Sequence, residues 1–399
     1  MTTFPLSRRA MLTAGIGSVF FASGAFADEA AARRKLVVII ARGGMDGLSV
    51  TPPLTDPNYE ALRGEIAIRP DEALAFDADF GLHPSLAAIH RLGQQGQLRI
   101  APAIATPDRA RSHFEAQDVL ESGSARVYSS SSGWLNRTLT AMGARHVEAL
   151  SVGSQAPLIL RGPVQAATWS PGKTSRGERL PMLLGDLYRD DPLLSKALAS
   201  GLETRAMADV ATRTSASMGA TSTPANQQAL EASRQTGRTV AGFMTQTEGP
   251  QIVALSLDGW DTHANQGGAE GQLANRLASL DATVDGLAQG LGVEWANTVV
   301  IVCTEFGRTA RINGTRGADH GTASTALVLG GALRSRKVLG DWPTLQSAKL
   351  FEDRDLAPTL DMRSLFKGVL SDHLGLERKA LDTLVFPDTA EIPPARVLA

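Results

Sequence analysis

Two stretches decide the fold class of this chain of 399 residues: Leu255-Ser-Leu-Asp258-Gly-Trp-Asp261-Thr-His263 and Val299-Val-Ile-Val-Cys-Thr-Glu305-Phe-Gly-Arg308. Each begins with an apolar run that predicts a buried strand, and each then breaks at glycine and becomes polar. Between them, Leu273 to Leu291 carries apolar residues at helical spacing. A strand, a helix and a second strand in this order are typical of a βαβ unit in a parallel sheet.

The rest of the chain extends this pattern toward one large α/β domain over residues 28–399. Apolar runs predict four further strands: Lys35–Ala41, Leu98–Ile104, Ala149–Val152 and Thr325–Leu329. Helical patterns cover Pro84–Gln94, a stretch from Thr106 to about Gly123, Trp134–Met142 and Asp355–Gly375. Because strands and helices alternate without an obvious linker, we expect a central, largely parallel sheet sandwiched between helices.

The first 27 residues have the pattern of a twin-arginine export signal. Ser7-Arg8-Arg9 forms its charged start, an apolar stretch rich in glycine and alanine follows, and Ala25-Phe26-Ala27 fits a cleavage site. The apolar stretch is too short and too interrupted by glycine and serine for a membrane span. We therefore expect a periplasmic or secreted protein, without a stable membrane span, that the twin-arginine translocase exports.

Residues 165–250 differ in composition from the rest of the chain. They are rich in alanine, serine, threonine and arginine, and Thr214–Asn226 is a segment of low complexity. The flanks Leu183–Ala208 and Gln227–Phe243 have helical patterns. This region is predicted to be a mostly helical insertion or lid with a mobile middle.

The composition argues against nucleic-acid binding and against an intrachain disulfide. A formal net charge of −2 at pH 7 gives no electrostatic basis for binding nucleic acid. Cys303 is the sole cysteine, so no intrachain disulfide forms. Its position inside an apolar strand is typical of a small buried hydrophobic residue rather than a reactive thiol.

Carboxylates and histidines follow the predicted strands, where ligands bind in open α/β sheets. Oxygen and imidazole ligands suit a divalent metal such as Zn or Mn. The candidate ligands are Asp46, Asp258, Asp261, His263, Glu305, Asp319 and His320. Structural roles are also open: Asp46 and Asp319 as turn residues, the carboxylates after Leu257 as loop or helix caps, and Glu305 as the partner of Arg308 or Arg311.

Ser112 has two compatible interpretations. With Glu115 three residues later it forms the pattern of a capping box. At a helix N-terminus it also has the position of a nucleophile, because backbone N–H groups there favour an incoming anion. Arg109 and Arg111 flank this site and suit the binding of a phosphate or sulfate group.

Six motifs of this chain together resemble the domain-of-unknown-function family 1501. They are RGGMDG (42–47), RSHFEAQD (111–118), SGWLNR (132–137), GWDTH (259–263), TEFGRT (304–309) and GADHG (317–321). That family is distantly similar to the alkaline phosphatase and sulfatase superfamily. The resemblance implies a large central sheet between helices, with a two-metal site at the strand ends.

The resemblance also implies residue roles. Asp46 corresponds to the first-strand ligand, Asp258 or Asp261 with His263 to an Asp–His ligand pair, and His320 to a late ligand. Glu305 stands where a ligand Asp is expected, but Phe306 replaces the histidine that should follow it. Ser112 lies near the expected nucleophile with His113 beside it, and Arg308 joins the candidate anion-binding arginines. Asp355-Leu-Ala-Pro-Thr-Leu360 resembles the start of a helix near the C-terminus.

These expectations leave two classes of function. The first is an exported hydrolase of phosphate or sulfate esters that depends on one or two divalent ions, Zn, Mn or Ca. The second is a non-catalytic periplasmic binding or assembly protein that retains the fold, with a second exported protein as a partner. A formylglycine sulfatase is excluded because the chain lacks the Cys-x-Pro-x-Arg motif.

Overall fold

The computed structural model describes residues 33–143, 149–153, 157–170, 198, 201–202, 204, 225–335 and 337–398. The expected export signal lies outside these residues, as does most of the expected helix Leu183–Ala208 and of the segment Thr214–Asn226. No helix within the described ranges is long and apolar enough to cross a membrane.

The described chain is built on a nine-stranded sheet of order β10-β4-β9-β8-β1-β7-β5-β6, in which β11 also pairs with β4. The strands are β1 Lys35–Arg42, β4 Leu98–Ala105, β5 Ala149–Val152, β6 Ala167–Trp169, β7 Ile252–Asp258, β8 Thr298–Cys303, β9 Ser324–Leu329, β10 Lys337–Val338 and β11 Leu360–Asp361. All pairs are parallel except those of β9 with β4 and β8. A small antiparallel pair, β2 Leu74–Ala75 and β3 Gly81–Leu82, is separate.

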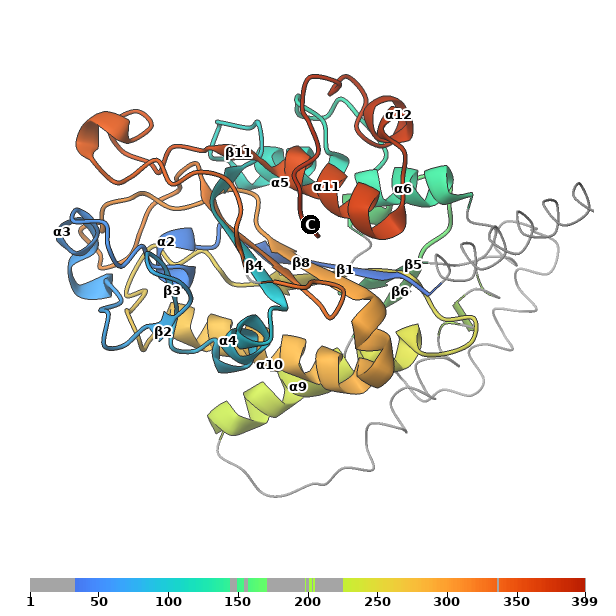
Figure 1. Ribbon diagram of the computed structural model, residues 1–399, viewed down its shortest axis with the longest axis horizontal. Helices are drawn as coiled ribbons and strands as arrows, with labels where there is room; N and C mark the ends of the chain where they lie inside the picture. The colour runs from blue at the N-terminus through green and yellow to red at the C-terminus, as the bar shows by residue number, and fades with distance from the viewer. Residues whose placement is uncertain are drawn as a thin grey trace, which may run out of the picture.

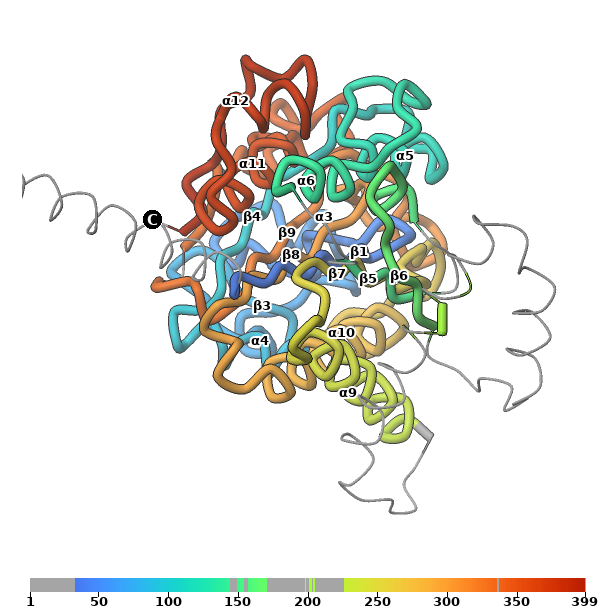
Figure 2. The backbone as a smooth tube through the Cα atoms, turned by 90° about the vertical axis from the view of Figure 1, so that its right-hand side faces the viewer, coloured from blue at the N-terminus to red at the C-terminus, as the bar shows by residue number. Residues whose placement is uncertain are grey.

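Helices cover both faces of the sheet (Figures 1 and 2). One face carries α4 Ala87–Gln94, α9 Ala225–Met244 and α10 Gln272–Leu291; the other carries α5 His113–Ser122, α6 Trp134–Met142, α11 Met362–Leu374 and α12 Arg378–Ala380. Shorter turns complete the described elements: α2 Gly47–Val50, α3 Tyr59–Arg63, the 3-10 helices Gly64–Ile66, Leu158–Leu160, Gly292–Asn297 and Ser347–Lys349, and the π-helix Leu381–Val385. The expected largely parallel sheet between helices is confirmed.

Burial on both faces explains why β1 is a continuous apolar run. Val37 and Ile39 belong to the core on one side of the sheet, and Leu36 and Val38 belong to the core on the other. All four side chains are fully buried. Such strands lack the alternation of polar and apolar residues that a half-exposed strand shows.

Three helices begin later than the sequence predicts, among them α4, which was expected from Pro84 and begins at Ala87. The helix expected from Thr106 begins at His113, because Arg111 adopts a φ of +56°, which interrupts a right-handed helix. The expected helix Asp355–Gly375 begins only at Met362. The segment before it contains Pro358, pairs with β4 as an extended strand and ends at Asp361, which caps the helix by accepting the Arg363 N–H.

Within residues 165–250, the expected flanking helix Gln227–Phe243 is present as α9. The first described residues of this region form β6, a strand at the edge of the main sheet, rather than a helix.

The sheet brings the polar loops to one edge. In the register of the central strands, Arg42 pairs with Asp258 and Ile40 pairs with Cys303. The loops that follow β1, β7 and β8 therefore begin side by side. β4 runs in the same direction, because it is antiparallel to β9, which is antiparallel to β8. The loop that leads from β4 to α5 therefore begins at this edge. The loop before β9 ends there as well.

Candidate metal centre

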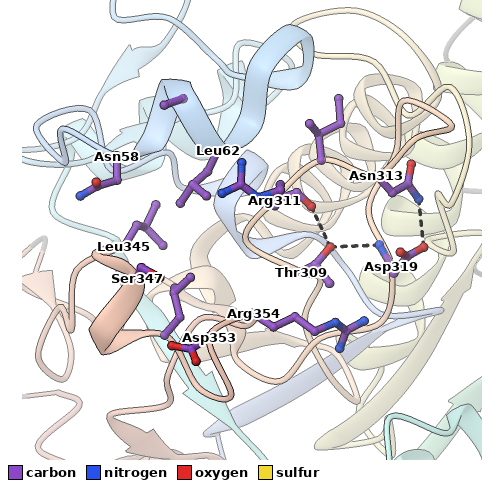
Figure 3. A pocket seen from close by; sticks show the side chains of 13 residues that line it. Asn58, Leu62, Thr309, Arg311, Asn313, Asp319, Leu345, Ser347, Asp353 and Arg354 are labelled. Atoms are coloured by element: carbon purple, nitrogen blue, oxygen red, sulfur yellow. Dashed lines mark hydrogen bonds between the residues drawn. The ribbon is translucent and has the colours of Figure 1, made fainter.

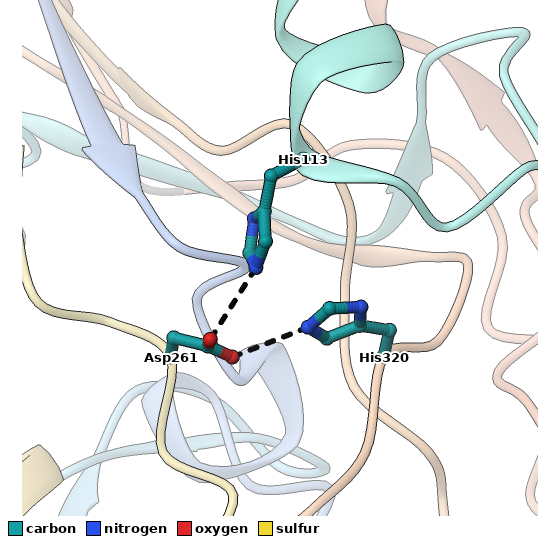
Figure 4. Close-up of side chains that lie close together, drawn as sticks. All are labelled: His113, Asp261 and His320. Carbon is teal, nitrogen blue, oxygen red and sulfur yellow. Dashed lines mark hydrogen bonds and ion pairs between the residues drawn. The ribbon is translucent and has the colours of Figure 1, made fainter.

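Side chains from one helix and two loops meet at this edge of the sheet. His113 comes from the first turn of α5, Asp261 from the loop after β7, and His320 from the loop before β9 (Figure 4). One nitrogen of each histidine and one carboxylate oxygen lie within 4.8 Å of one another. His320 Nε2 is 3.2 Å from Asp261 Oδ1, and His113 Nε2 is 3.4 Å from Asp261 Oδ2.

A third histidine borders this group. His263 Nε2 lies 3.0 Å from Asp261 Oδ1 and 3.0 Å from His320 Nε2. We refer to His113, His263 and His320, arranged around Asp261, as the imidazole cluster.

Each histidine of the imidazole cluster is oriented through its other ring nitrogen. The Nδ1 acceptors are Glu305 Oε1 for His113 at 2.9 Å, the Arg111 carbonyl for His320 at 2.9 Å and Asp319 Oδ1 for His263 at 3.1 Å. Carbonyl and ionised carboxylate oxygens only accept hydrogen bonds, so each Nδ1 donates. In a neutral ring Nε2 then carries no proton, and its lone pair points toward Asp261. Histidines that bind a metal likewise donate one ring N–H to an acceptor and keep the other nitrogen free for the ion.

The resulting arrangement fits a divalent cation. His263 Nε2 and His320 Nε2 lie 3.0 Å apart, while the Nδ1 of each ring is held by an acceptor. Ligand atoms about 2.0–2.1 Å from a tetrahedral ion lie about 3.3 Å apart, so this spacing suits two ligands of one ion. His113 Nε2 is buried and has no hydrogen-bond partner among the described residues. Imidazole nitrogens with a carboxylate oxygen are ligands typical of Zn and Mn.

The protonation states of Asp261 and His320 favour the same interpretation. Burial alone would raise the pKa of Asp261, but the hydrogen bond and charge of Arg308 lower it to about 2. Burial lowers the pKa of His320, whereas the hydrogen bond with Glu305 raises that of His113. An ionised Asp261 and a neutral His320 are the forms that bind metal.

Glu305 orients His113 and does not belong to the group of converging ligand atoms. Its carboxylate is fully buried and accepts hydrogen bonds from the Gly43 N–H at 2.8 Å, Gln117 Nε2 at 3.2 Å and the Thr304 hydroxyl at 3.0 Å. Burial would raise the pKa of Glu305, but its hydrogen bonds, with that of His113 the largest, lower it.

Arg308, which we expected to bind substrate, ties the loops of the site together. Its guanidinium is buried and donates to Asp261 Oδ1 at 2.6 Å. It also donates to the carbonyls of Gly44 at 2.6 Å, Ala318 at 3.0 Å and Trp260 at 3.1 Å, and to that of Gly43. One side chain thus joins the loops after β1, after β7 and before β9.

Asp46 lies in a different, buried network. Its Oδ2 forms an ion pair with Arg63, and both side chains are almost fully buried. Gln266 Nε2 and the Ser49 hydroxyl donate to the same oxygen at 2.6 and 3.0 Å. Sequence reasoning missed Arg63 and Gln266, because neither belongs to a motif or directly follows a strand.

The other predicted site residues are spread around the centre. Asp319 holds His263, whereas Asp258 ends β7 exposed and makes no side-chain hydrogen bond to the described residues. Arg111 forms ion pairs with Asp355 at 2.8 Å and Glu352 at 2.6 Å. Arg109 donates to the backbone carbonyls of Thr106 and Asp108.

Ser112 occupies the N-cap position of α5, but its side chain makes no capping hydrogen bond. The capping-box interpretation is therefore wrong. The first turn of α5 keeps its N–H groups without a side-chain acceptor, and such a turn attracts anions.

Phe306 fills the space beside the histidines. Its ring centroid lies 4.9 Å from that of His113 and 4.8 Å from that of His320, and the ring is buried. A Cβ at Gly44 would come within 2.5 Å of the Phe306 ring, and Gly44 has a φ of +70°. Glycine is therefore required where the first loop passes this ring.

Fold and site together define an α/β protein with a candidate metal centre at the strand ends. The chain belongs to the family described as "Protein of unknown function (DUF1501)", whose model matches residues 33–385. No curated protein matches the sequence.

Solved structures resemble the chain in outline. The C-terminal periplasmic domain of EcEptC from Escherichia coli, in a complex with Zn, is 9% identical over 89% of this chain and 87% of that chain, with a TM-score of 0.41. Phosphonate monoester hydrolase of Agrobacterium radiobacter is 9% identical over 86% and 74%, with a TM-score of 0.40. A protein in the alkaline phosphatase superfamily from Vibrio parahaemolyticus is 11% identical over 76% and 62%, with a TM-score of 0.34. A likeness of this degree transfers no residue role to this chain.

Proposed function

We propose that this chain is an exported, metal-dependent hydrolase of phosphate or sulfate esters that acts in the periplasm. The supporting observation is the imidazole cluster, in which three Nε2 atoms converge on Asp261 while each Nδ1 is held by an acceptor. His113, Asp261 and His320 would hold one ion, with His263 completing the set. A nitrogen-rich set favours Zn or Mn over Ca. Such an ion, when bound, stabilises negative charge on the ester oxygens.

Ser112 is the proposed nucleophile. It directly precedes His113, its side chain makes no hydrogen bond to the part of the chain that the structure describes, and it stands at the uncapped N-terminus of α5. The N–H groups of that first turn favour the anionic group of the substrate. The serine oxygen would form a bond to phosphorus or sulfur while the ester oxygen leaves as the protonated alcohol. Water then releases phosphate or sulfate from the serine.

Ser112→Ala is expected to lower the hydrolysis of 4-nitrophenyl phosphate or 4-nitrophenyl sulfate by about a thousandfold or more, because it removes the attacking oxygen. The metal content is expected to stay at the wild-type value. Ser124→Ala, just beyond the other end of α5, is the matched control and should retain full activity. Turnover unchanged in Ser112→Ala would exclude this serine as the nucleophile.

Glu305→Gln is expected to weaken metal binding by about 10–100-fold, because the uncharged amide holds the His113 ring less strongly. Competition with a chromogenic chelator measures this affinity without any substrate. Glu60→Gln, on the exposed surface of α3, serves as the control. Equal affinities of Glu305→Gln and wild type would show that Glu305 does not support the centre.

A non-catalytic binding or assembly protein is the second candidate. Phe306 packs where the family resemblance places a further histidine. Arg63 neutralises the candidate ligand Asp46. The remaining candidate residues therefore offer ligands for one ion rather than two. This candidate predicts stoichiometric metal without turnover of either ester. It also predicts that a second exported protein co-purifies with the chain.

A further inference from the structure

A cavity lies beside the imidazole cluster. Its volume is about 400 Å³, within the range of about 300–1,000 Å³ that is usual for small-molecule sites. It is formed by α5, the end of β7, Gly153 and residues 157–161, and its lining includes Arg42, Phe114, Gln117, Tyr128, Arg161 and Asp258. We propose that this cavity binds the sugar ring of a saccharide, which would be the ester-bearing part of the substrate if the proposed function holds.

The cavity and the candidate centre share structural residues. Gln117 Nε2 donates to Glu305, which holds His113, and Gln117 Oε1 accepts from Arg42 at 2.9 Å. Phe114 follows His113 directly in the first turn of α5. A substrate whose ester group reaches His113 therefore has the adjoining cavity for its remaining part.

Two exposed aromatic rings mark the cavity. Phe114 is 81% exposed and Tyr128 is 67% exposed, and they are the two aromatic residues among the exposed large hydrophobic side chains of the described chain. Tyr128 has a φ of +54°, an unfavourable conformation for a bulky residue, and Asp118 accepts its backbone N–H at 2.7 Å. Exposed aromatic rings that line a cavity are suited to stack against a ring of a ligand.

The polar lining favours a neutral, hydroxylated ring. Arg161 and Asp258 make no side-chain hydrogen bond or ion pair with the described residues, so both a donor and an acceptor are available. Carboxylates outnumber guanidiniums in the lining, which disfavours a highly charged anion. Hydroxyl groups both donate and accept, whereas the C–H face of a sugar stacks on aromatic rings.

Another cavity near the site differs in character. It has a similar volume of about 410 Å³ and reaches Asp319, but its lining contains no aromatic side chain (Figure 3). Arg311 and Arg354 contribute guanidinium groups there instead. The combination of aromatic rings with free polar groups therefore distinguishes the cavity beside α5.

The proposal is tested by measuring the binding of the mature protein to an array of natural oligosaccharides. The glycan with the strongest signal is then titrated into the protein to measure its affinity. Phe114→Ala and Tyr128→Ala are each expected to weaken this binding by about tenfold, because each removes a stacking ring. Tyr128→Phe keeps the ring and should retain most of the affinity. Val293→Ala, at an 87% exposed position outside this cavity, is the control and should bind like wild type.

The outcomes separate this proposal from the proposed function. Glycan binding needs no turnover and is expected to persist after treatment with a chelator, so it supports the cavity even if hydrolysis is never observed. An array without any bound glycan would overturn the proposal. Binding that both alanine variants leave unchanged would overturn it as well.

Discussion

His320→Ala is expected to lower the metal content of the mature protein from about one equivalent per chain to near zero. The variant removes one of the nitrogens that converge on Asp261, and it also removes the ring that His263 Nε2 approaches at 3.0 Å. Elemental analysis of the purified protein measures this loss. Because His320 lies in a loop and is partly exposed, folding should be retained, which circular dichroism can show.

His90→Ala is the matched control for this experiment. His90 lies on α4, which covers the face of the sheet opposite to α5. Its Nε2 bonds to the carbonyl of Ala75. Its loss should leave the metal content unchanged. Metal that persists in His320→Ala, or that is absent from the wild type, would count against the centre and favour the non-catalytic candidate.

The central strands were predictable because their residues are buried on both faces. A strand such as β8 Thr298–Cys303 is buried along its whole length and apolar after its first residue, so its boundaries are visible in the sequence. The starts of α5 and α11 were not predictable in the same way. They depend on the backbone of Arg111 and on the pairing of β11 with β4, and neither leaves a periodic pattern.

The location of the site was predictable, but the division of roles within it was not. Parallel strands bring their carboxyl ends together, so carboxylates and histidines after several strands were expected to meet. Asp261 points into the imidazole cluster, whereas Glu305 lies behind His113 and Asp46 pairs with Arg63. These differences arise from contacts between residues far apart in the chain, and one sequence does not encode them as a motif.

Arg63→Met is expected to lower the free energy of unfolding by about 3–5 kcal/mol, because it leaves the Asp46 carboxylate buried without its cation. Arg63 donates to Asp46 and, at 3.1 Å, to the carbonyl of Thr309 and the Ser49 hydroxyl, so several buried acceptors lose a donor. Chemical denaturation followed by circular dichroism measures the change. Arg91→Met, which breaks the half-exposed pair with Asp285, should cost less than about 1 kcal/mol.

The double variant Arg63→Met with Asp46→Asn shows whether the buried charge is the cause. Asparagine carries no charge to leave unpaired, so the double variant should recover part of the lost stability. If it is no more stable than Arg63→Met, the loss comes from packing around Arg63 instead. The Asp46–Arg63 pair also anchors the loop whose Gly44 carbonyl accepts from Arg308. Arg63→Met should therefore weaken both folding and metal binding, whereas His320→Ala should weaken metal binding alone.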